Sequence, residues 1–512
     1  MIDLTPRDYQ KTIFETAKNA NTLVVLPTGV GKTLIALMLT IERLKQHPGK
    51  KALILAPTRP LVEQHYESFK KQLPELFADI QLFTGSVPAK ERKKIWDTAD
   101  IILSTPQCVS NDLEKYLYTL SDVSLLVIDE AHRCLKNYSY TAVAEKYKSQ
   151  ATSQRILGLT ASPGSEMEKV KQICKHLNIS EVEVRTRDSP DVKPYLQELE
   201  FNKVPVEFPK EFIEIRTLLQ NIYNSKVFQL KSRNLLFGPT NKITLLKLQK
   251  KLGAQLSSQN FNAMIGLSLC AQAIKVAHAI ELLETQTLSG FHTYLKQIIK
   301  DAEEKKSKAV QQIVNSPEFK ATLISLNDLI AKKVEHPKIE KVREIADKEL
   351  KENKKAKLII FTQFRETASK LTETLNQNKD IKAAVFIGQT KKKTQSGTSG
   401  LNQKEQKGII SQFREGKINV ICATSIGEEG LDIPEVSAVI FYEPIPSEIR
   451  KIQRTGRTAR LNAGKLFLLV TEKTKDEISH YASTAREKKM YRTLDKIKDE
   501  IKKQPKTLDY YK

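Results

Sequence analysis

One short motif constrains the fold of this chain more than any other feature. Residues 22–26 form an apolar run that predicts a buried strand, and residues 34–39 have the apolar spacing of a helix. The seven residues between them read Pro-Thr-Gly-Val-Gly-Lys-Thr. A glycine turn that leads into a helix N-terminus points backbone N–H groups at an anion. The sequence therefore predicts a phosphate-binding loop in a parallel α/β domain, made of Pro27, Thr28, Gly29, Val30, Gly31, Lys32 and Thr33.

Two side chains of this loop and two acids downstream carry the predicted chemistry. Lys32 supplies positive charge for the β- and γ-phosphates of ATP, and the Thr33 hydroxyl is placed to bind Mg²⁺. A second apolar run, at residues 125–128, leads directly into Asp129 and Glu130. We expect Asp129 to hold Mg²⁺, directly or through water, and Glu130 to orient and deprotonate the attacking water. In this order, the two motifs predict a nucleotide-hydrolysing enzyme.

Further residues near these motifs are candidates for binding the base and for reporting nucleotide state. Arg7 and Gln10 precede the loop, and a glutamine amide can pair with a donor and an acceptor of adenine at once. An ordinary surface helix start is the alternative. His132 either relays nucleotide state or only packs, and Thr160 and Ser162, which follow another apolar run, are expected to couple the cleft to a second lobe.

A basic segment towards the C-terminal end supplies the remaining catalytic candidates. Residues 453–460 read Gln-Arg-Thr-Gly-Arg-Thr-Ala-Arg, so Arg457 and Arg460 would share one face of a helix. Two guanidiniums aimed across a domain cleft can neutralise charge on the transferring γ-phosphoryl group, with Gln453 beside them. A basic surface turn is the alternative. Two residues of the glycine-containing segment 423–434 join the candidates, Thr424 for a phosphate and Asp432 for the ribose.

Composition narrows the class of protein. The 512 residues are 40% hydrophobic, and no apolar run reaches the roughly 18 residues of a membrane span. Residues 1–7 show no basic stretch followed by an apolar one, so we do not expect secretion. Five scattered cysteines without a CxxC pair predict reduced thiols in a cytoplasmic protein. We expect it to associate with the nucleoid and to have no membrane partner. The net charge of +23, from 83 basic and 60 acidic residues, favours a polyanionic partner whose binding depends strongly on salt.

The chain divides into segments that differ in the spacing of their apolar residues. Residues 1–204 and 336–495 alternate short apolar runs with helical stretches, which predicts two parallel-sheet lobes wrapped by helices. Residues 205–335 show helical spacing, at Phe212, Ile215, Leu219 and Ile222 for example, and predict an inserted all-helical domain. Residues 388–400 should form a mobile basic loop, and residues 496–512 a tail. The expected strands are residues 22–26, 52–56, 80–83, 101–104, 125–128 and 155–160, then 357–361, 383–386, 419–423, 438–442 and 465–470.

The order of these motifs resembles that of superfamily 2 helicases. Residues 129–134 (DEAHRC), 427–436 (GEEGLDIPEV) and 441–460 (FYEPIPSEIRKIQRTGRTAR) look most like archaeal Hef helicases and their Fanconi anaemia M-type relatives. The resemblance covers residues 1–200 and 335–495. It implies two RecA-like lobes, a thumb-like insert and an ATP-driven DNA translocase that moves 3′ to 5′ and remodels forked and branched DNA. It also implies nucleic-acid contacts from Arg59, Thr84, Gly85, Thr105, Gln363 and Arg365.

Two other functions stay open at this point. One is an ATPase stimulated by double-stranded RNA, because innate-immune RNA sensors share two lobes and a helical insert. The other is a scaffold with a vestigial ATPase, against which the intact Lys32, Asp129 and Glu130 argue.

The insert and the tail suggest how partners are bound. Branch recognition needs a second surface at an angle to the two lobes, and the insert is large enough to supply one. Its basic candidates are Lys242, Lys247, Lys250, Lys251, Lys305, Lys306 and Lys308. Residues 504–511 resemble a sliding-clamp-binding motif, with Thr507 where an aliphatic residue is expected and a frayed terminus as the alternative. The nuclease domain of many Hef proteins has no counterpart in these 512 residues, and three alternatives stay open: that domain was removed, was lost, or is encoded separately as a partner.

Overall fold

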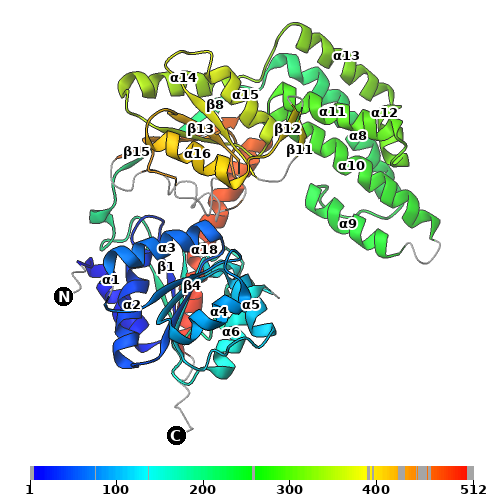
Figure 1. Ribbon diagram of the computed structural model, residues 1–512. Coiled ribbons are helices and arrows are strands. Elements are labelled where there is room, and N and C mark those ends of the chain that lie inside the picture. Colours follow the sequence, from blue (N-terminus) through cyan, green and yellow to red (C-terminus); the bar gives the residue numbers. More distant parts are fainter. Residues whose placement is uncertain are drawn as a thin grey trace.

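The computed structural model (Figure 1) describes residues 5–503 except 75, 137, 256–259, 389–391, 395–396, 425–432, 446, 448–457 and 459–462. Two parallel sheets, each covered by helices, form two lobes, and a separate helical bundle extends from the second lobe. The predicted fold class is confirmed.

The first lobe is built on a seven-stranded parallel sheet with the order β3-β4-β2-β5-β6-β1-β7. Its central strands are buried on both faces, so their sequences are continuous apolar runs. In β1, Leu23 and Val25 face one core and Val24 faces the other. The strands are β1 (Thr22–Val25), β2 (Lys51–Leu55), β3 (Ile80–Phe83), β4 (Ile101–Ser104), β5 (Val123–Asp129), β6 (Ile156–Thr160) and β7 (Glu181–Val184).

Helices cover the two faces of this sheet in two groups. One face carries α1 (Asp8–Asn19), α2 (Lys32–Gln46) and α3 (Arg59–Gln72). The other carries α4 (Ala89–Thr98), α5 (Pro106–Glu114), α6 (Ser139–Gln150) and α7 (Met167–His176). Strand β7 was not expected, because at the sheet edge its sequence Glu-Val-Glu-Val buries only Val182 and forms no apolar run.

The second lobe has a six-stranded parallel sheet with the order β10-β13-β9-β14-β15-β8. All five strands expected in this region are present, with ends that differ by at most one residue. They are β9 (Leu358–Phe361), β10 (Ala383–Phe386), β13 (Val420–Ala423), β14 (Ala438–Phe441) and β15 (Gly464–Thr471), joined by α14 (Lys338–Glu352), α15 (Arg365–Leu375) and α16 (Gln403–Arg414). Within residues 388–400 the structure contains two short antiparallel strands, β11 (Lys392–Thr394) and β12 (Gly397–Ser399), and the mobility of this loop stays a prediction.

Two domain boundaries differ from the prediction. Strand β8 (Leu199–Val206) spans the expected boundary after residue 204, yet it pairs with β15 over eight residues and belongs to the second sheet as a whole. Helix α18 (Lys475–Lys503) crosses the other expected boundary, after residue 495. It leaves the second lobe and returns to the first, where Leu494 and Ile497 are buried in the core (Figure 1). Residues 496–503 are therefore part of a helix that joins the two lobes, not of a tail.

The insert is the predicted helical bundle. Its helices are α8 (Ile213–Ser232), α9 (Lys242–Ala254), α10 (Phe261–Thr285), α11 (Leu288–Glu303), α12 (Lys308–Val314) and α13 (Pro317–Ala331). An Asn, Ser or Thr side chain caps the N-terminus of each helix from α9 to α13. By length and composition alone α10 would suit a membrane span, but 14 of its 25 residues are buried in the bundle. At Gly266, an added Cβ would lie 2.5 Å from Leu235, so this glycine allows the chain after α8 to pack closely against α10.

Candidate nucleotide and nucleic-acid site

The order of strands in the first sheet separates two groups of predicted site residues. Because all its strands are parallel, their carboxyl ends lie along one edge. The phosphate loop, Asp129 and Thr160 follow β1, β5 and β6, which are neighbours. Arg59, Thr84 and Thr105 follow β2, β3 and β4, which form the other half of the sheet. One edge of the sheet thus has two halves. The nucleotide half lies at the ends of β1, β6 and β5. The strand-contacting half, at the ends of β2, β3 and β4, carries residues predicted to contact a nucleic-acid strand.

The phosphate loop has the predicted conformation. Gly29 and Gly31 have φ angles of 84° and 78°, in the left-handed region that favours glycine. An added Cβ at Gly31 would lie only 2.4 Å from Nε2 of Gln10. Lys32 begins α2, and its ammonium donates to the carbonyls of Leu26 and Pro27 at 3.0 and 3.2 Å. The cation is therefore held at the loop where phosphate oxygens would compete for it; Thr28 and Thr33 are partly exposed beside it.

Gln10 lies behind the loop with its amide already engaged. Its Oε1 accepts from the backbone N–H of Arg7 at 2.9 Å, and its Nε2 donates to the carbonyls of Val30 and Gly31 at 3.2 and 3.3 Å. The Arg7 guanidinium lies 4.8 Å from the centre of the Tyr195 ring, a residue that the sequence did not single out. To pair with adenine, Gln10 would have to exchange these bonds; its role in base binding stays a prediction.

Asp129 ends β5 and is held from two sides. Its Oδ2 lies 2.8 Å from Nε2 of His65, and its Oδ1 accepts from the Glu130 backbone N–H at 3.0 Å. Burial alone would raise the pKa of this carboxyl, but the bond to His65 and the charges of His65 and Lys32 hold the pKa below its ordinary value. Asp129 is therefore an anion beside the phosphate loop, as a metal ligand must be.

Glu130 has an unusual conformation and an unsatisfied oxygen. Its φ and ψ are 52° and 49°, the left-handed region that costs a non-glycine residue energy and often marks a functional site. Its Oε2 is buried and has no hydrogen-bond partner among the described residues. Nδ1 of His132 approaches it to 3.2 Å, in a geometry that makes no hydrogen bond. A buried carboxylate oxygen without a partner fits the predicted role of binding a reacting water.

A chain of contacts leads from Glu130 towards the second lobe. Nδ1 of His132 lies 3.2 Å from the Thr160 hydroxyl, which in turn donates to the carbonyl of Ser162 at 3.0 Å. The Ser162 hydroxyl donates to the sulfur of Met490 on α18 at 2.9 Å. The three residues predicted to couple the cleft are thus in contact, and they reach the helix that comes from the second lobe.

The predicted ATP and Mg²⁺ fit this arrangement. Among the described residues no group of three or more His, Cys, Asp or Glu could hold a metal ion on its own. Mg²⁺ in phosphate-transfer sites needs only one or two protein ligands, because phosphates and waters supply the rest. Thr33 follows the loop after β1 and Asp129 ends β5, with only β6 between these strands, so the two residues fit that requirement.

The strand-contacting candidates also follow the carboxyl ends of strands, but the structure engages them to different degrees. Arg59 is exposed and pairs with Glu63 at 2.7 Å, and Glu63 also pairs with Lys407 of the second lobe at 3.3 Å. Gly85 is exposed, with open space around it. The remaining hydroxyls make contacts within the protein: Thr84 with Ser86 at 2.7 Å and Thr105 with Cys108 at 3.2 Å.

In the second lobe, a buried network supports the segment that follows β9. The backbone N–H of the exposed Gln363 donates to Glu443 at 2.6 Å, and the amide of Gln286, from the insert, donates to the same carboxylate at 3.2 Å. Arg365 donates to the Gly388 carbonyl at 3.4 Å, and Thr424 is buried after β13. The insert is therefore attached to the segment that carries the predicted nucleic-acid contacts.

Several predicted residues lie outside the described residues: Asp432, Gln453, Arg457 and Arg460. Thr458 is described, and its hydroxyl donates to the carbonyl of Val436 in the second lobe at 2.7 Å.

The insert lysines fall into two groups. Lys247, Lys250 and Lys251 on α9 are exposed, and none of them forms an ion pair in the part of the chain that the structure describes. Lys306, by contrast, lies 2.9 Å from Asp301 and 2.7 Å from Glu304, beside the exposed Lys305. The two groups, which are alike in sequence, thus differ in how far nearby acids neutralise them.

Sequence reasoning missed His65 and the pair Gln286–Glu443. His65 lies six residues beyond Arg59, and nothing in its spacing links it to Asp129. Glu443 belongs to the 441–460 motif, but only the fold brings it to Gln363.

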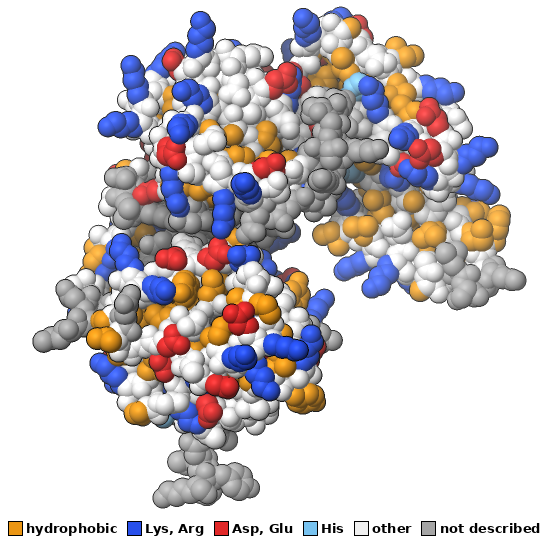
Figure 2. Space-filling view, in the orientation of Figure 1, with side chains coloured by type: hydrophobic (Ala, Val, Ile, Leu, Met, Phe, Trp, Pro, Cys, Tyr) orange, Lys and Arg blue, Asp and Glu red, His pale blue; other side chains and the backbone are white. Residues whose placement is uncertain are grey.

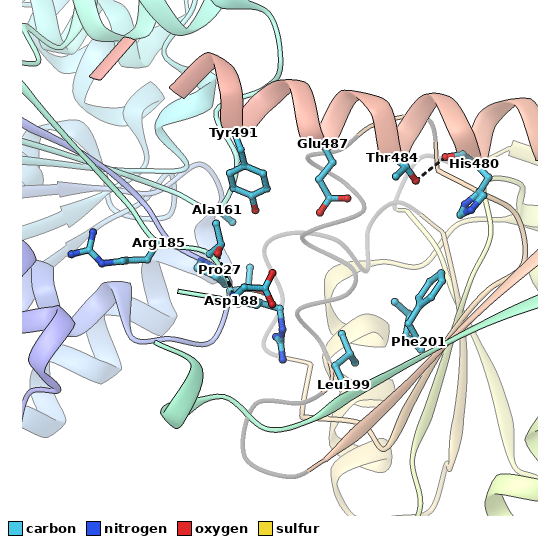
Figure 3. A pocket seen from close by; sticks show the side chains of 14 residues that line it. Pro27, Ala161, Arg185, Asp188, Leu199, Phe201, His480, Thr484, Glu487 and Tyr491 are labelled. Carbon is cyan, nitrogen blue, oxygen red and sulfur yellow. Dashed lines mark hydrogen bonds between the residues drawn. The ribbon is translucent and has the colours of Figure 1, made fainter. Parts of the chain in front are cut away.

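A cavity of about 580 Å³ lies between the lobes next to the phosphate loop. Figure 3 shows His480, Glu487 and Tyr491 of α18 pointing into it, with Pro27 on the first lobe and Phe201 on β8 of the second. Because its walls come from both lobes, its shape depends on how far the cleft is closed.

Comparison with known proteins identifies the family. The sequence profiles that match are "DEAD/DEAH box helicase" over residues 7–170, "Putative ATP-dependent RNA helicase, helical bundle" over residues 211–336 and "Helicase conserved C-terminal domain" over residues 338–462. The crystal structure of the Pyrococcus furiosus Hef helicase domain is similar, with 40% identity and a TM-score of 0.71, over 93% of this chain and 98% of that one. The chain belongs to the Hef and Fanconi anaemia M-type superfamily 2 helicases.

Curated relatives of this helicase are longer. A putative ATP-dependent RNA helicase of Methanocaldococcus jannaschii is 38% identical over 96% of this chain and 61% of its own length. The ATP-dependent DNA helicase mph1 of Neurospora crassa is 34% identical over 91% of this chain and 41% of its own length. The chain therefore spans between about two fifths and three fifths of these relatives, within which the resemblance inferred from the motifs is confirmed.

Proposed function

We propose that this helicase is an ATP- and Mg²⁺-dependent, DEAH-box DNA translocase that moves 3′ to 5′ and unwinds or remodels forked and branched DNA during repair. Stalled forks and four-way junctions are the proposed substrates. One observation carries the proposal: a single sheet edge bears the nucleotide residues on β5, β6 and β1 and the strand-contacting residues on β3, β4 and β2. The two halves are in contact where β5 lies beside β2: Nε2 of His65 is 2.8 Å from Oδ2 of Asp129.

Each residue of the nucleotide half has a separate role in ATP hydrolysis. Lys32 leaves the loop carbonyls and neutralises phosphate charge, and Glu130 orients the attacking water and accepts its proton. Bound between Thr33 and Asp129, Mg²⁺ would supply positive charge to the β- and γ-phosphate oxygens. Arg457 and Arg460, from the second lobe, would stabilise the charge that develops on the transferring group.

Hydrolysis is coupled to movement through residues that touch both halves. The loss of the γ-phosphate changes what Asp129 and Glu130 bind, and His65 and His132 contact these acids directly. His65 lies on α3, which begins at the predicted strand contact Arg59, and His132 leads through Thr160 and Ser162 to α18. Nucleotide state can thus shift the grip on DNA and the angle between the lobes.

Relatives named as DNA helicases, among them mph1 of Neurospora crassa and fml1 of Schizosaccharomyces pombe, favour DNA over RNA as the substrate. The mph1 relative is named a DNA helicase and the Methanocaldococcus relative a putative RNA helicase, so the substrate is a proposal and not a transfer of either name. The test is ATPase and unwinding on a matched panel: single strand, duplex, fork, four-way junction and RNA duplex. Stimulation by RNA duplex but not by forks would favour the RNA-stimulated ATPase, and turnover near background with every substrate would favour a vestigial scaffold.

Two protein partners are proposed alongside DNA: a sliding clamp, bound through residues 504–511, and a separately encoded nuclease. Residues 504–512 lie outside the described residues, so the clamp-binding motif rests on sequence alone. Deletion of residues 504–512 should abolish a pull-down by the cognate clamp and leave ATPase unchanged. Unchanged binding would contradict the motif.

A further inference from the structure

We propose that the tip of the insert stacks unpaired bases at the branch point of a DNA fork on exposed aromatic rings, while lysines around the rings bind neighbouring phosphates. The tip comprises the end of α8, the loop after it, α9 and the start of α10, residues 226–266 without 256–259. The inference rests on the proposed function, because it names what the insert recognises at a branch.

The first observation is a long stretch of chain without acids. From residue 215 to residue 280 there is no Asp or Glu, in a protein with 60 acidic residues among 512. The same stretch contains nine basic residues: Arg216, Lys226, Lys231, Arg233, Lys242, Lys247, Lys250, Lys251 and Lys275. A surface of one charge that lacks acids of its own attracts a polyanion.

The second observation is that the structure gathers this charge at one end of the bundle. Lys242, at the start of α9, pairs at 2.9 Å with Glu281 near the end of α10. Leu252, near the end of α9, packs at Gly266 near the start of α10, so the two helices run antiparallel. Arg233 donates to Asn262 at 3.3 Å, which brings the end of α8 to the same place. In the described part of the tip, Lys226, Lys231, Lys247, Lys250 and Lys251 have no acidic partner.

The third observation is that large apolar side chains lie among these lysines in water. Phe228, Phe237 and Phe261 are 71%, 73% and 71% exposed. Ile243 and Leu246 are exposed on the same face of α9 as Lys247 and Lys250, since positions three and four apart are neighbours on a helix. Figure 2 shows hydrophobic side chains gathered over α9 with Lys and Arg at their border.

These observations together define the chemistry of the occupant. Lysines alone would bind any duplex through its phosphates, and would leave the rings in water without a role. Aromatic rings beside a basic surface are the combination that binds single strands, because every base offers a flat face for stacking. Bases are available for stacking only where strands separate, so such a surface distinguishes a branch from a duplex.

The experiment compares salt dependence between two sets of variants. Fork DNA with unpaired bases at its branch is titrated against Phe228→Ala/Phe237→Ala/Phe261→Ala and against Lys247→Ala/Lys250→Ala/Lys251→Ala. We expect the phenylalanine variant to bind roughly tenfold or more weakly with an unchanged salt slope, because stacking releases no counterions. The lysine variant should bind more weakly with a reduced slope. Ile324→Ala, at an equally exposed residue of α13 (73%), is the matched control and should bind as wild type.

A second readout places the contact at the branch. Wild-type protein should change the fluorescence of 2-aminopurine at the branch, and the phenylalanine variant should not. A fork with abasic sites there should lower the affinity of wild type to that of the variant, whose own affinity should not fall further. All three rings are exposed, so unchanged melting temperatures are expected and would exclude misfolding.

If the phenylalanine variant binds the fork and changes the fluorescence as wild type does, the inference is wrong, and the apolar patch would belong to a protein partner. If wild-type protein itself shows no preference for forks, the proposed function fails. The two failures are therefore distinguishable.

Discussion

The nucleotide half of the first sheet edge and the tip of the insert hold their charged groups in opposite ways. In the nucleotide half, Lys32 donates to loop carbonyls and Asp129 is held by His65 and by the backbone. At the tip, lysines extend into water without acidic partners, and phenylalanine rings lie exposed between them. One region is pre-organised for a ligand of fixed shape, and the other offers a broad surface to a polymer whose position varies.

The difference shows which variants should affect chemistry and which should affect substrate choice. A pre-organised site fails when one group is displaced, whereas a surface of many weak contacts loses affinity in steps. Variants of the nucleotide half should therefore reduce turnover on every DNA, and variants of the tip should reduce only the preference for forks.

The largest expected effect on turnover comes from removing either residue of the arginine pair, which would extend the pre-organised site across the cleft. Arg457→Ala or Arg460→Ala should lower kcat about 10³-fold with little change in nucleotide affinity, because the charge that they stabilise develops in the transition state. Stopped-flow nucleotide binding and steady-state ATPase measure the two effects separately. A pure loss of affinity in both variants would contradict the assignment.

Glu130→Gln should lower the rate of hydrolysis about 10²-fold or more and leave ATP binding intact, because the base is lost while Asp129 and Thr33 stay in place. Lys32→Ala is the comparison variant, and should lose nucleotide binding as well. Hydrolysis by Glu130→Gln at the wild-type rate would show that Glu130 is not the base.

His65→Ala should lower kcat about tenfold, the usual effect of removing a group that orients a metal ligand. DNA-stimulated turnover should fall more than basal turnover, because His65 also lies on the helix that begins at Arg59. Equal losses in both rates would show that His65 only orients Asp129 and does not couple hydrolysis to DNA.

The smallest expected effect is on the stability of the folded protein, and it comes from the Lys242–Glu281 ion pair that joins α9 to α10. Burial raises the pKa of Glu281, but hydrogen bonds from His278 and Lys242 lower it to about 2, below the ordinary value of 4.5. A carboxyl with a lowered pKa in the folded state stabilises the fold above pH 4.5, and this contribution is lost as the pH falls towards 2. Lys242→Met should therefore cost less than about 1 kcal/mol at pH 7 and flatten the pH dependence of the melting temperature between these values. A parallel pH profile would contradict the pairing.

The sequence predicted the two regions unequally, for physical reasons. Buried parallel strands are continuous apolar runs, and the phosphate loop needs glycine at two positive φ angles. The central strands and the phosphate loop of the first lobe could therefore be predicted residue by residue. Edge strands β7 and β8 each bury a single residue, Val182 and Val206, and their sequences contain no such run. The contacts of His65 and Gln286 join residues 64 and 157 positions apart, which no local pattern reports. The insert was recognisable as helical, but the exposed faces of its helices depend on packing that spacing alone does not fix.

The central claim is that the lobes supply the motor and the tip supplies the preference for branches. The most direct test is the ratio of fork-stimulated to single-strand-stimulated ATPase, as kcat/KM, for Lys247→Ala/Lys250→Ala/Lys251→Ala. The matched control is Lys300→Ala/Lys305→Ala/Lys306→Ala, which removes the same charge from the insert near Asp301 and Glu304. The account predicts that the ratio falls in the tip variant, because phosphate contacts beside the rings are lost, and keeps its wild-type value in the control, with single-strand turnover unchanged in both. Equal ratios in the two variants, whether preserved or lost, would contradict it.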